Sequence, residues 1–251
     1  EHTSEGDKLC GLVPRRRQID EFADNSWDIS ASADLDEVID TVWGPLEQRL
    51  PNGLAEIRRR VLAVGLVRRE ETDQLLYLTI QPFDPDRLRD RGVSRGYPGS
   101  FEIDALPAWI GFGMPTVTAG TAPDETVTVS GDEELSFQLP MALRELRSRH
   151  GHLSGRGVDV AGDFRTLAKE CGRDEARFRK ANGGATPDQF VIFGHDAAGN
   201  AFVFDRDDLD TRRDPKAATW NRRSWKVGER QAFWKVMDVV VRHMIGVQLC
   251  D

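Results

Sequence analysis

Two short apolar runs separated by a turn constrain the fold of this chain more than any other stretch. The runs are residues 190–193, Phe-Val-Ile-Phe, and residues 201–204, Ala-Phe-Val-Phe. The segment between them, His195-Asp-Ala-Ala-Gly-Asn200, has a composition typical of a turn. The pattern predicts a β-hairpin, which is preceded by Asn182-Gly183-Gly184 and followed by a group of aspartates that begins at Asp205.

Periodic apolar positions elsewhere in the chain predict helices, and short β-prone runs predict further strands. The predicted helices are residues 33–49, 54–66, 139–149, 162–181 and 230–247. The predicted strands outside the hairpin are residues 75–81, 126–130 and 135–139. Gly44-Pro45 and Gly172 are candidate break points within two of the helices. This mixture predicts an α+β fold, with a mixed or antiparallel β-sheet flanked by helices.

The segment His150-Gly-His-Leu-Ser-Gly-Arg-Gly157 is rich in glycine and short polar residues, and it predicts a linker. We therefore expect a flexible N-terminal tail at residues 1–27, an N-terminal α+β region at residues 28–150 and a C-terminal α+β region at residues 151–251. One continuous domain is the alternative.

Composition excludes several classes of protein. The 251 residues carry a net charge of −8, which disfavours direct binding of nucleic acid because such binding depends on a basic surface. No apolar run reaches the roughly 18 residues of a membrane span, so we expect no contact with a membrane. Cys10, Cys171 and Cys250 are odd in number and contain no CxxC pair. A reducing, cytoplasmic location is therefore expected.

Metal binding is a hypothesis for the aspartates after the hairpin. Asp205, Asp207 and Asp208, with His195, could supply ligands to a divalent cation, and Asp205 and Asp207 would point to one face if they lay on a strand. An acidic strand exit that pairs with nearby arginines is the alternative. No phosphate-binding loop or dinucleotide motif is present, so we expect no cofactor.

Carboxylates are concentrated between Gln18 and Gln48, where no Lys or Arg occurs. The nine are Asp20, Glu21, Asp24, Asp28, Asp34, Asp36, Glu37, Asp40 and Glu47. Asp34, Asp36, Glu37 and Asp40 fall on the predicted helix 33–49, and they are candidate contacts for a basic protein partner. A solvated face without a partner is the alternative.

Tryptophans and basic residues alternate between residues 220 and 234. The segment contains Trp220, Trp225, Trp234, Arg222, Arg223, Lys226 and Arg230. Trp and Arg side chains are enriched at protein interfaces, so Trp220 and Trp225 are candidate partner-binding residues. The alternative is that the tryptophans pack in the core and hold the preceding loop.

The Asn182-Gly183-Gly184 turn, the strand ending at Gly194, the strand from Gly199 to Asp205 and the terminal helix together resemble the SUKH superfamily. The resemblance covers about 90 residues, from Asp159 to Val247, and implies a SUKH-like α+β C-terminal part.

Members of that superfamily mostly serve as immunity proteins, which bind and neutralise bacterial toxins that are often nucleases. The resemblance therefore implies a non-enzymatic protein-binding module of immunity type, whose partner is a basic toxin such as a nuclease. One alternative is a metal-dependent enzyme acting on phosphate esters or nucleotides. Another is a structural or assembly protein of a phage or secretion particle.

Overall fold

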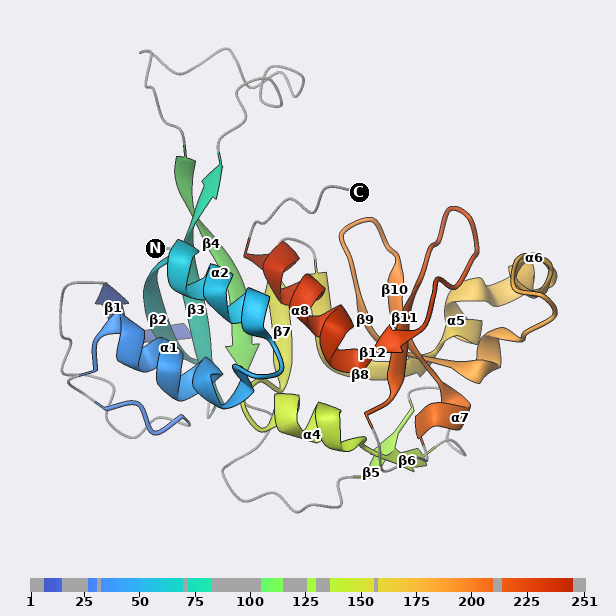
Figure 1. The fold of residues 1–251 in the computed structure, drawn as a ribbon, viewed down its shortest axis with the longest axis horizontal. Helices are drawn as coiled ribbons and strands as arrows, with labels where there is room; N and C mark the ends of the chain where they lie inside the picture. The colour runs from blue at the N-terminus through green and yellow to red at the C-terminus, as the bar shows by residue number, and fades with distance from the viewer. Residues whose placement is uncertain are drawn as a thin grey trace, which may run out of the picture.

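The fold is α+β and is built on one antiparallel sheet, as predicted (Figure 1). The computed structural model describes residues 7–14, 27–30, 33–69, 72–82, 105–114, 126–129, 136–155, 158–209 and 214–245. In these ranges, ten strands follow one another across the sheet in chain order, and two further strands, β5 and β6, pair separately.

The strands of the main sheet have the following bounds. They are β1 (Asp7–Pro14), β2 (Val61–Arg69), β3 (Thr72–Pro82), β4 (Ala105–Met114), β7 (His152–Gly155), β8 (Val158–Thr166), β9 (Phe190–His195), β10 (Ala201–Asp205), β11 (Lys216–Trp220) and β12 (Gln231–Ala232). The separate pair is β5 (Thr126–Thr128) and β6 (Ser136–Gln138).

Short helices connect and cover these strands. They are α1 (Leu35–Trp43), α2 (Pro51–Arg60), α4 (Met141–Arg147), α5 (Leu167–Cys171), α6 (Glu175–Ala181), α7 (Arg206–Leu209) and α8 (Phe233–Met244). The 3₁₀ turns are η1 (Gly44–Leu46), η2 (Gly172–Asp174) and η3 (Pro187–Gln189). Among these described elements, no helix combines the length and the apolar character that a membrane crossing requires.

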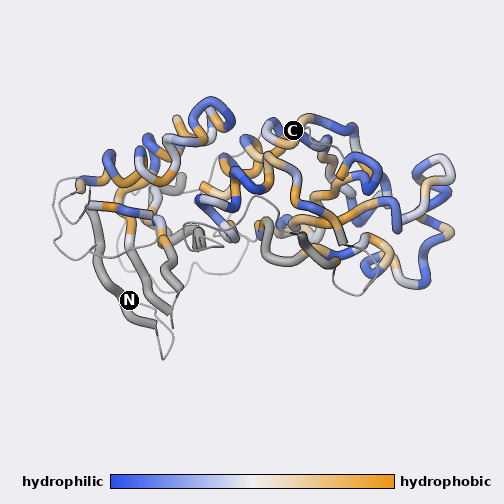
Figure 2. Tube along the Cα trace, turned by 90° about the horizontal axis from the view of Figure 1, so that it is seen from below, coloured by the Kyte–Doolittle hydropathy of each residue, from blue (hydrophilic) through white to orange (hydrophobic). Residues whose placement is uncertain are grey.

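The predicted hairpin is confirmed as β9 and β10, and both of its faces are buried. Val191 and Phe193 belong to a core shared with α1, α2, α4 and α8, whereas Phe190 and Ile192 belong to a second core under α5 and α6. Successive strand residues point to opposite faces, so a strand covered on both faces must be apolar throughout. In Figure 2 hydrophobic residues run along the strands, while along the helices they alternate with hydrophilic ones.

Helix α1 forms where the apolar periodicity predicts it. Its apolar positions are buried, and η1 follows at Gly44 because Pro45 cannot continue the backbone hydrogen-bond pattern of an α-helix. The predicted break at Gly172 is confirmed as well, since α5 ends at Cys171 and Gly172 adopts φ +51°.

Two predicted helices extend too far. Residues 61–66, predicted as helix, belong to strand β2, and residues 162–166 belong to β8. Short apolar runs have no periodicity that separates a helix from a buried strand. In the sheet, Val61 and Val64 are fully buried, so contacts with other strands decide the conformation.

The predicted linker is also wrong in part, since strand β7 occupies residues 152–155. His150 is fully buried, with its ring centroid 4.1 Å from that of Trp43. Strand β7 pairs with both β4 and β8, so the sheet runs without a break across residue 150. The division into two regions at that position remains a prediction.

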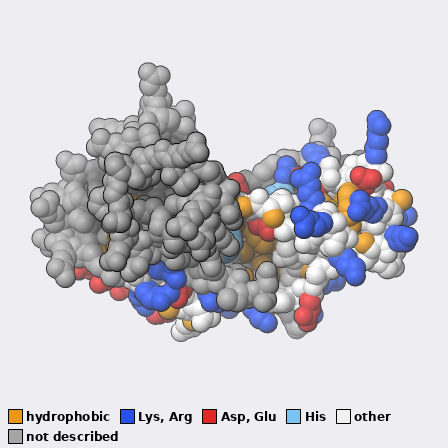
Figure 3. Space-filling view, turned by 90° about the horizontal axis from the view of Figure 1, so that it is seen from above, with side chains coloured by type: hydrophobic (Ala, Val, Ile, Leu, Met, Phe, Trp, Pro, Cys, Tyr) orange, Lys and Arg blue, Asp and Glu red, His pale blue; other side chains and the backbone are white. Residues whose placement is uncertain are grey.

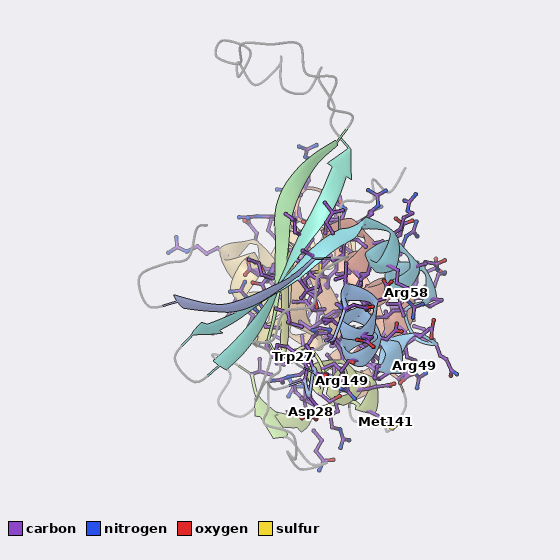
Figure 4. The ribbon with its side chains drawn as sticks, turned by 90° about the vertical axis from the view of Figure 1, so that its left-hand side faces the viewer. Trp27, Asp28, Arg49, Arg58, Met141 and Arg149 are labelled. Carbon is purple, nitrogen blue, oxygen red and sulfur yellow. The ribbon has the colours of Figure 1, made fainter. Side chains whose placement is uncertain are left out.

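The first 27 residues, expected as a flexible tail, include strand β1, which pairs with β2. Trp27 is buried, and its Nε1 donates a hydrogen bond to the carbonyl oxygen of Arg149 over 2.9 Å. Figure 4 shows Trp27 and Arg149 close together below the sheet. The described residues of this segment, 7–14 and Trp27, are therefore part of the fold.

Candidate functional site

The loop between β11 and β12 is held by Asn182, the C-cap residue of α6. The Asn182 side-chain amide donates to the carbonyl oxygens of Phe178 and Trp225, each over 2.8 Å. Its Oδ1 accepts the backbone N–H of Val227, also over 2.8 Å. The amide thus donates to one backbone group of the loop and accepts from another, as the backbone of a neighbouring strand would. Sequence reasoning assigned Asn182 only to a turn, because its two partners in the loop, Trp225 and Val227, lie more than 40 residues away.

Trp225 sits at the centre of this loop in an unusual backbone conformation. Its φ is +65°, in the left-handed region that a bulky side chain rarely adopts. Its N–H donates to the carbonyl oxygen of Asn221 over 2.7 Å. The ring is partly buried and meets Trp220 edge to face, with 5.8 Å between ring centroids. Trp220 is only 1% exposed, so of the two predicted partner-binding tryptophans only Trp225 can contact a partner.

Basic side chains surround Trp225. The guanidinium carbon of Arg177, an exposed residue of α6, lies 5.1 Å from the centroid of the Trp225 ring. Arg222, Arg223 and Lys226 are exposed on the loop itself. Within the described ranges, none of these four cations forms an ion pair. We call Arg177, Arg222, Arg223, Trp225 and Lys226 the Trp225 surface.

Figure 3 shows that Lys and Arg side chains gather over the half of the molecule opposite the grey residues. The turn of the β9–β10 hairpin contacts the loop between β11 and β12, because Asn200 Oδ1 accepts the backbone N–H of Arg222 over 3.1 Å. The Arg222 side chain also lies so close to Gly199 that a Cβ there would be 3.3 Å from Nη1. The loop is therefore supported by both α6 and the hairpin.

The acidic face predicted on residues 33–49 lies on α1, at the other end of the sheet from α6 (Figure 1). Asp34 and Glu37 form a capping box: Asp34 Oδ1 accepts the Glu37 N–H, and Glu37 Oε2 accepts the Asp34 N–H, both over 2.9 Å. Asp40 accepts a hydrogen bond from Arg58 over 2.8 Å. Asp36 is exposed, and its side chain forms no hydrogen bond or ion pair with another described residue.

Arg58 links α2 to this face and is labelled in Figure 4. Besides Asp40, it binds Glu47 over 2.9 Å, and the hydrogen bonds to these two carboxylates raise its pKa above the usual arginine value. Of the four carboxylates predicted to contact a partner, Asp34, Glu37 and Asp40 therefore already form hydrogen bonds within the protein. Asp20, Glu21 and Asp24 lie outside the described residues.

The structure does not bring the proposed metal ligands together. Asp205 pairs across the hairpin with Phe190, whereas His195 pairs with Ala201, so Asp205 and His195 lie at opposite ends of β9 and β10. Within the residues that are described, no three His, Cys, Asp or Glu side chains converge on a metal position.

Asp205 instead has structural partners. Its side chain is 9% exposed, forms an ion pair with Arg230 and accepts the backbone N–H of Asp207 over 3.0 Å. It therefore caps α7, which begins at residue 206. Asp207 lies on this helix, where it is exposed, and Asp208 is partly buried. The expectation that Asp205 and Asp207 share a strand face is wrong, because the strand ends at Asp205.

His195 belongs to a polar cluster that the sequence did not reveal. Its Nε2 lies 3.2 Å from Arg165 Nη2, and the same Arg165 nitrogen lies 2.9 Å from Glu170 Oε1. Arginine can only donate, so Nε2 accepts and the ring is neutral. Burial and then the Arg165 charge lower the pKa of His195. In this arrangement the Nε2 lone pair is engaged by Arg165.

Neighbouring polar contacts extend the cluster across β7 and β8. His152 Nε2 lies 2.8 Å from Asp159 Oδ1, and this hydrogen bond is the main cause that lowers the pKa of Asp159. The sequence did not indicate the pair of His152 and Asp159, because residues 150–157 were predicted as a linker and only the pairing of β7 with β8 brings the two side chains together. Ion-paired groups of this kind stabilise a sheet face and do not by themselves indicate a reaction.

A pocket of about 570 Å³ opens beside η1. Its lining residues are Gly44, Pro45, Glu47, Gln48, Arg49 and Glu145. Arg49, labelled in Figure 4, lies 3.4 Å from Glu145 and 3.6 Å from Asp214. The one cation lining the pocket is thus already paired, which leaves the Trp225 surface as the stronger candidate.

Comparisons with known proteins add no relative: the chain matches no protein-family model, and neither a curated protein nor a solved structure is significantly similar to it.

Proposed function

We propose that this protein is a non-enzymatic binding module that docks a protein partner on the Trp225 surface. We further propose that it is an immunity protein, which neutralises a bacterial toxin in the cytoplasm. The geometry of that surface supports the binding role. The immunity role comes from the resemblance of residues 159–247 to the SUKH superfamily.

The backbone of Trp225 is the observation that carries the binding role. A bulky residue at φ +65° costs of order 1–3 kcal/mol, and such strain is concentrated at functional positions. Here the strain is held in place by Asn182 and coincides with an exposed set of cations. A partly exposed Trp beside Arg is also the side-chain combination that dominates binding energy at protein interfaces.

A basic toxin would require an acidic docking face, and the predicted one is α1. Asp34 and Glu37 accept backbone N–H groups in the capping box, and Asp40 is paired with Arg58. These contacts must be broken or shared before the carboxylates can meet the cations of a partner. The cations of the Trp225 surface have no such competitor among the described carboxylates. We therefore favour the Trp225 surface over the α1 face as the first contact.

The geometry does not favour the metal-dependent enzyme. Asp205 is committed to Arg230 and to the cap of α7, and His195 lies at the far end of the hairpin. No observation favours the structural or assembly role.

Affinity capture tests the proposed function. The tagged protein would be used on an extract of the source organism, and any stoichiometric partner would be identified by mass spectrometry and retitrated by calorimetry. We expect a toxin as partner and a loss of affinity of at least tenfold in Trp225→Ala. Arg179→Gln is the matched control, because Arg179 is exposed on α6 but paired with Glu175. The absence of a stoichiometric partner, or equal binding by Trp225→Ala, would contradict the proposal.

A further inference from the structure

Arginine guanidinium groups lie over aromatic rings at several places in the described part of the fold, and those of Arg230 and Arg177 are compared first. The guanidinium carbon of Arg230 lies 5.9 Å from the centroid of Phe190, and that of Arg177 lies 5.1 Å from the centroid of Trp225. Arg230 also binds the carboxylate of Asp205. Arg177 lies over the Trp225 ring, but it has no carboxylate partner among the described residues.

Arg49, like Arg230, combines an aromatic ring with carboxylate partners. Its guanidinium carbon lies 5.7 Å from the Trp234 ring centroid, while Glu145 and Asp214 approach its nitrogens at 3.4 and 3.6 Å. An aromatic ring takes one face of the guanidinium plane and leaves the N–H groups at its edge free. Those N–H groups match a carboxylate in geometry and can bind it with two parallel hydrogen bonds.

We propose that Arg177 receives a carboxylate from the protein partner, and that the segment docking on the Trp225 surface is acidic. This inference rests on the proposed function and names the chemistry of the partner. The Trp225 ring restricts the position of the guanidinium before binding, so less side-chain entropy is lost when the carboxylate arrives.

The rest of the surface supports an acidic segment several residues long. Arg222, Arg223 and Lys226 add three exposed cations on the same loop as Trp225, and Glu229 is the one acid in residues 221–230. Phosphates would also satisfy cations, but the net charge of −8 repels a nucleic acid at long range. A short acidic peptide experiences less of that repulsion, so a protein ligand is favoured.

The test uses the complete chain and a peptide of alternating aspartate and glutamate residues. Isotope-labelled protein is titrated with the peptide at low salt, and backbone and indole signals are followed by NMR. We expect saturable shifts that are largest at Arg177 and Trp225, and weaker binding as salt rises. Arg177→Gln should weaken binding about tenfold or more, and Arg177→Lys should not restore it, because an ammonium lacks the planar pair of donors.

Arg179→Gln is again the control and should bind as the wild type does. The inference is overturned by an absence of saturable binding, by unchanged affinity in Arg177→Gln, or by tighter binding of an oligothymidylate of equal length, which would indicate a phosphate site. The proposed function is judged separately, on the captured partner. If Trp225→Ala loses that partner while Arg177→Gln keeps it, the proposed binding function is supported and the proposal of an acidic docking segment is wrong.

Discussion

Asp238 caps a helix that lies 185 residues away in the sequence: its Oδ1 accepts the backbone N–H of Gly53 over 2.7 Å. Asp238 Oδ2 also accepts the side-chain amide of Asn52 over 2.8 Å. Helix α2 begins at Pro51 after Leu50, which offers no side-chain cap. The buried carboxylate from α8 therefore does the work that an Asp or Ser at the N-cap position does in other helices.

Asp238→Ala should lower the free energy of unfolding by about 2 kcal/mol, because it leaves the Gly53 N–H without a partner inside the fold. Asp238→Asn keeps one acceptor oxygen and should cost less. Urea denaturation followed by circular dichroism measures both. Asp36→Ala, at an exposed position of α1, is the control and should stay within about 0.5 kcal/mol of wild type. Equal stabilities for the wild type and Asp238→Ala would contradict the cap.

Asn182→Ala should destabilise the protein by about 2 kcal/mol, since three hydrogen bonds are lost. Asn182→Asp should be worse, because a carboxylate would face the carbonyl oxygens of Phe178 and Trp225. Thermal unfolding of the two variants gives the order. Lys180→Ala, exposed on the same helix, should leave the unfolding temperature unchanged. If Asn182→Asp were the more stable variant, the assigned orientation of the amide would be wrong.

Trp225→Gly should be less destabilising than Trp225→Ala by about 1 kcal/mol. Both variants lose the contacts of the indole with Trp220 and Arg177. Glycine adopts φ +65° without strain, whereas alanine keeps the penalty of a Cβ in that region. The comparison requires equilibrium unfolding of both variants in the same buffer. An alanine variant as stable as the glycine variant would show that the loop relaxes and that the backbone of Trp225 is not constrained.

His150 should make stability depend on pH. Burial, with a smaller contribution from the Arg149 charge, lowers the pKa of His150 from 6.5 to about 3. As the pH falls below about 6.5, the unfolded chain takes up a proton at this residue and the folded chain does not. The free energy of unfolding therefore decreases, by up to about 1.4 kcal/mol per pH unit from this residue, until the pH approaches 3.

The variant His150→Phe isolates this effect, because it keeps an aromatic ring against Trp43 and removes the titrating group. Neither ring nitrogen of His150 has a hydrogen-bond partner within the described part of the chain, so the substitution should not leave a new unpaired group. Carboxylates titrate in both proteins and cancel in the comparison. Unfolding at pH 7 and pH 5 should show a smaller loss for His150→Phe, and identical losses would refute the prediction.

Millimolar Mg²⁺, Mn²⁺ or Ca²⁺ should not raise the melting temperature. A cation bound to the folded protein would raise it by mass action, but Asp205 already holds Arg230 and caps α7. Differential scanning fluorimetry measures the shift. A rise that disappears in Asp205→Asn would restore the metal site as a hypothesis.

Local sequence was sufficient for elements whose pattern is encoded within a few turns. The hairpin at residues 190–205, helix α1 and the break at Gly172 were predicted because alternation, helical periodicity and glycine or proline act on the nearest residues. The candidate site was found only in part. The Trp and Arg content of residues 220–230 pointed to a binding surface, but nothing local separated buried Trp220 from half-exposed Trp225.

The sequence by itself determined the α+β class, the hairpin and the aromatic basic segment. Tertiary structure alone decided that residues 61–66 extend as a strand, that His150 is buried, that Asp238 caps α2 and that the Arg177 guanidinium lies over the Trp225 ring. Each of these depends on contacts between residues that are distant in the chain, and their energy exceeds the small local preferences that a sequence pattern reports. The Trp225 surface combines residues of α6 with residues of the loop between β11 and β12, so its residues were visible in the sequence and their arrangement was not.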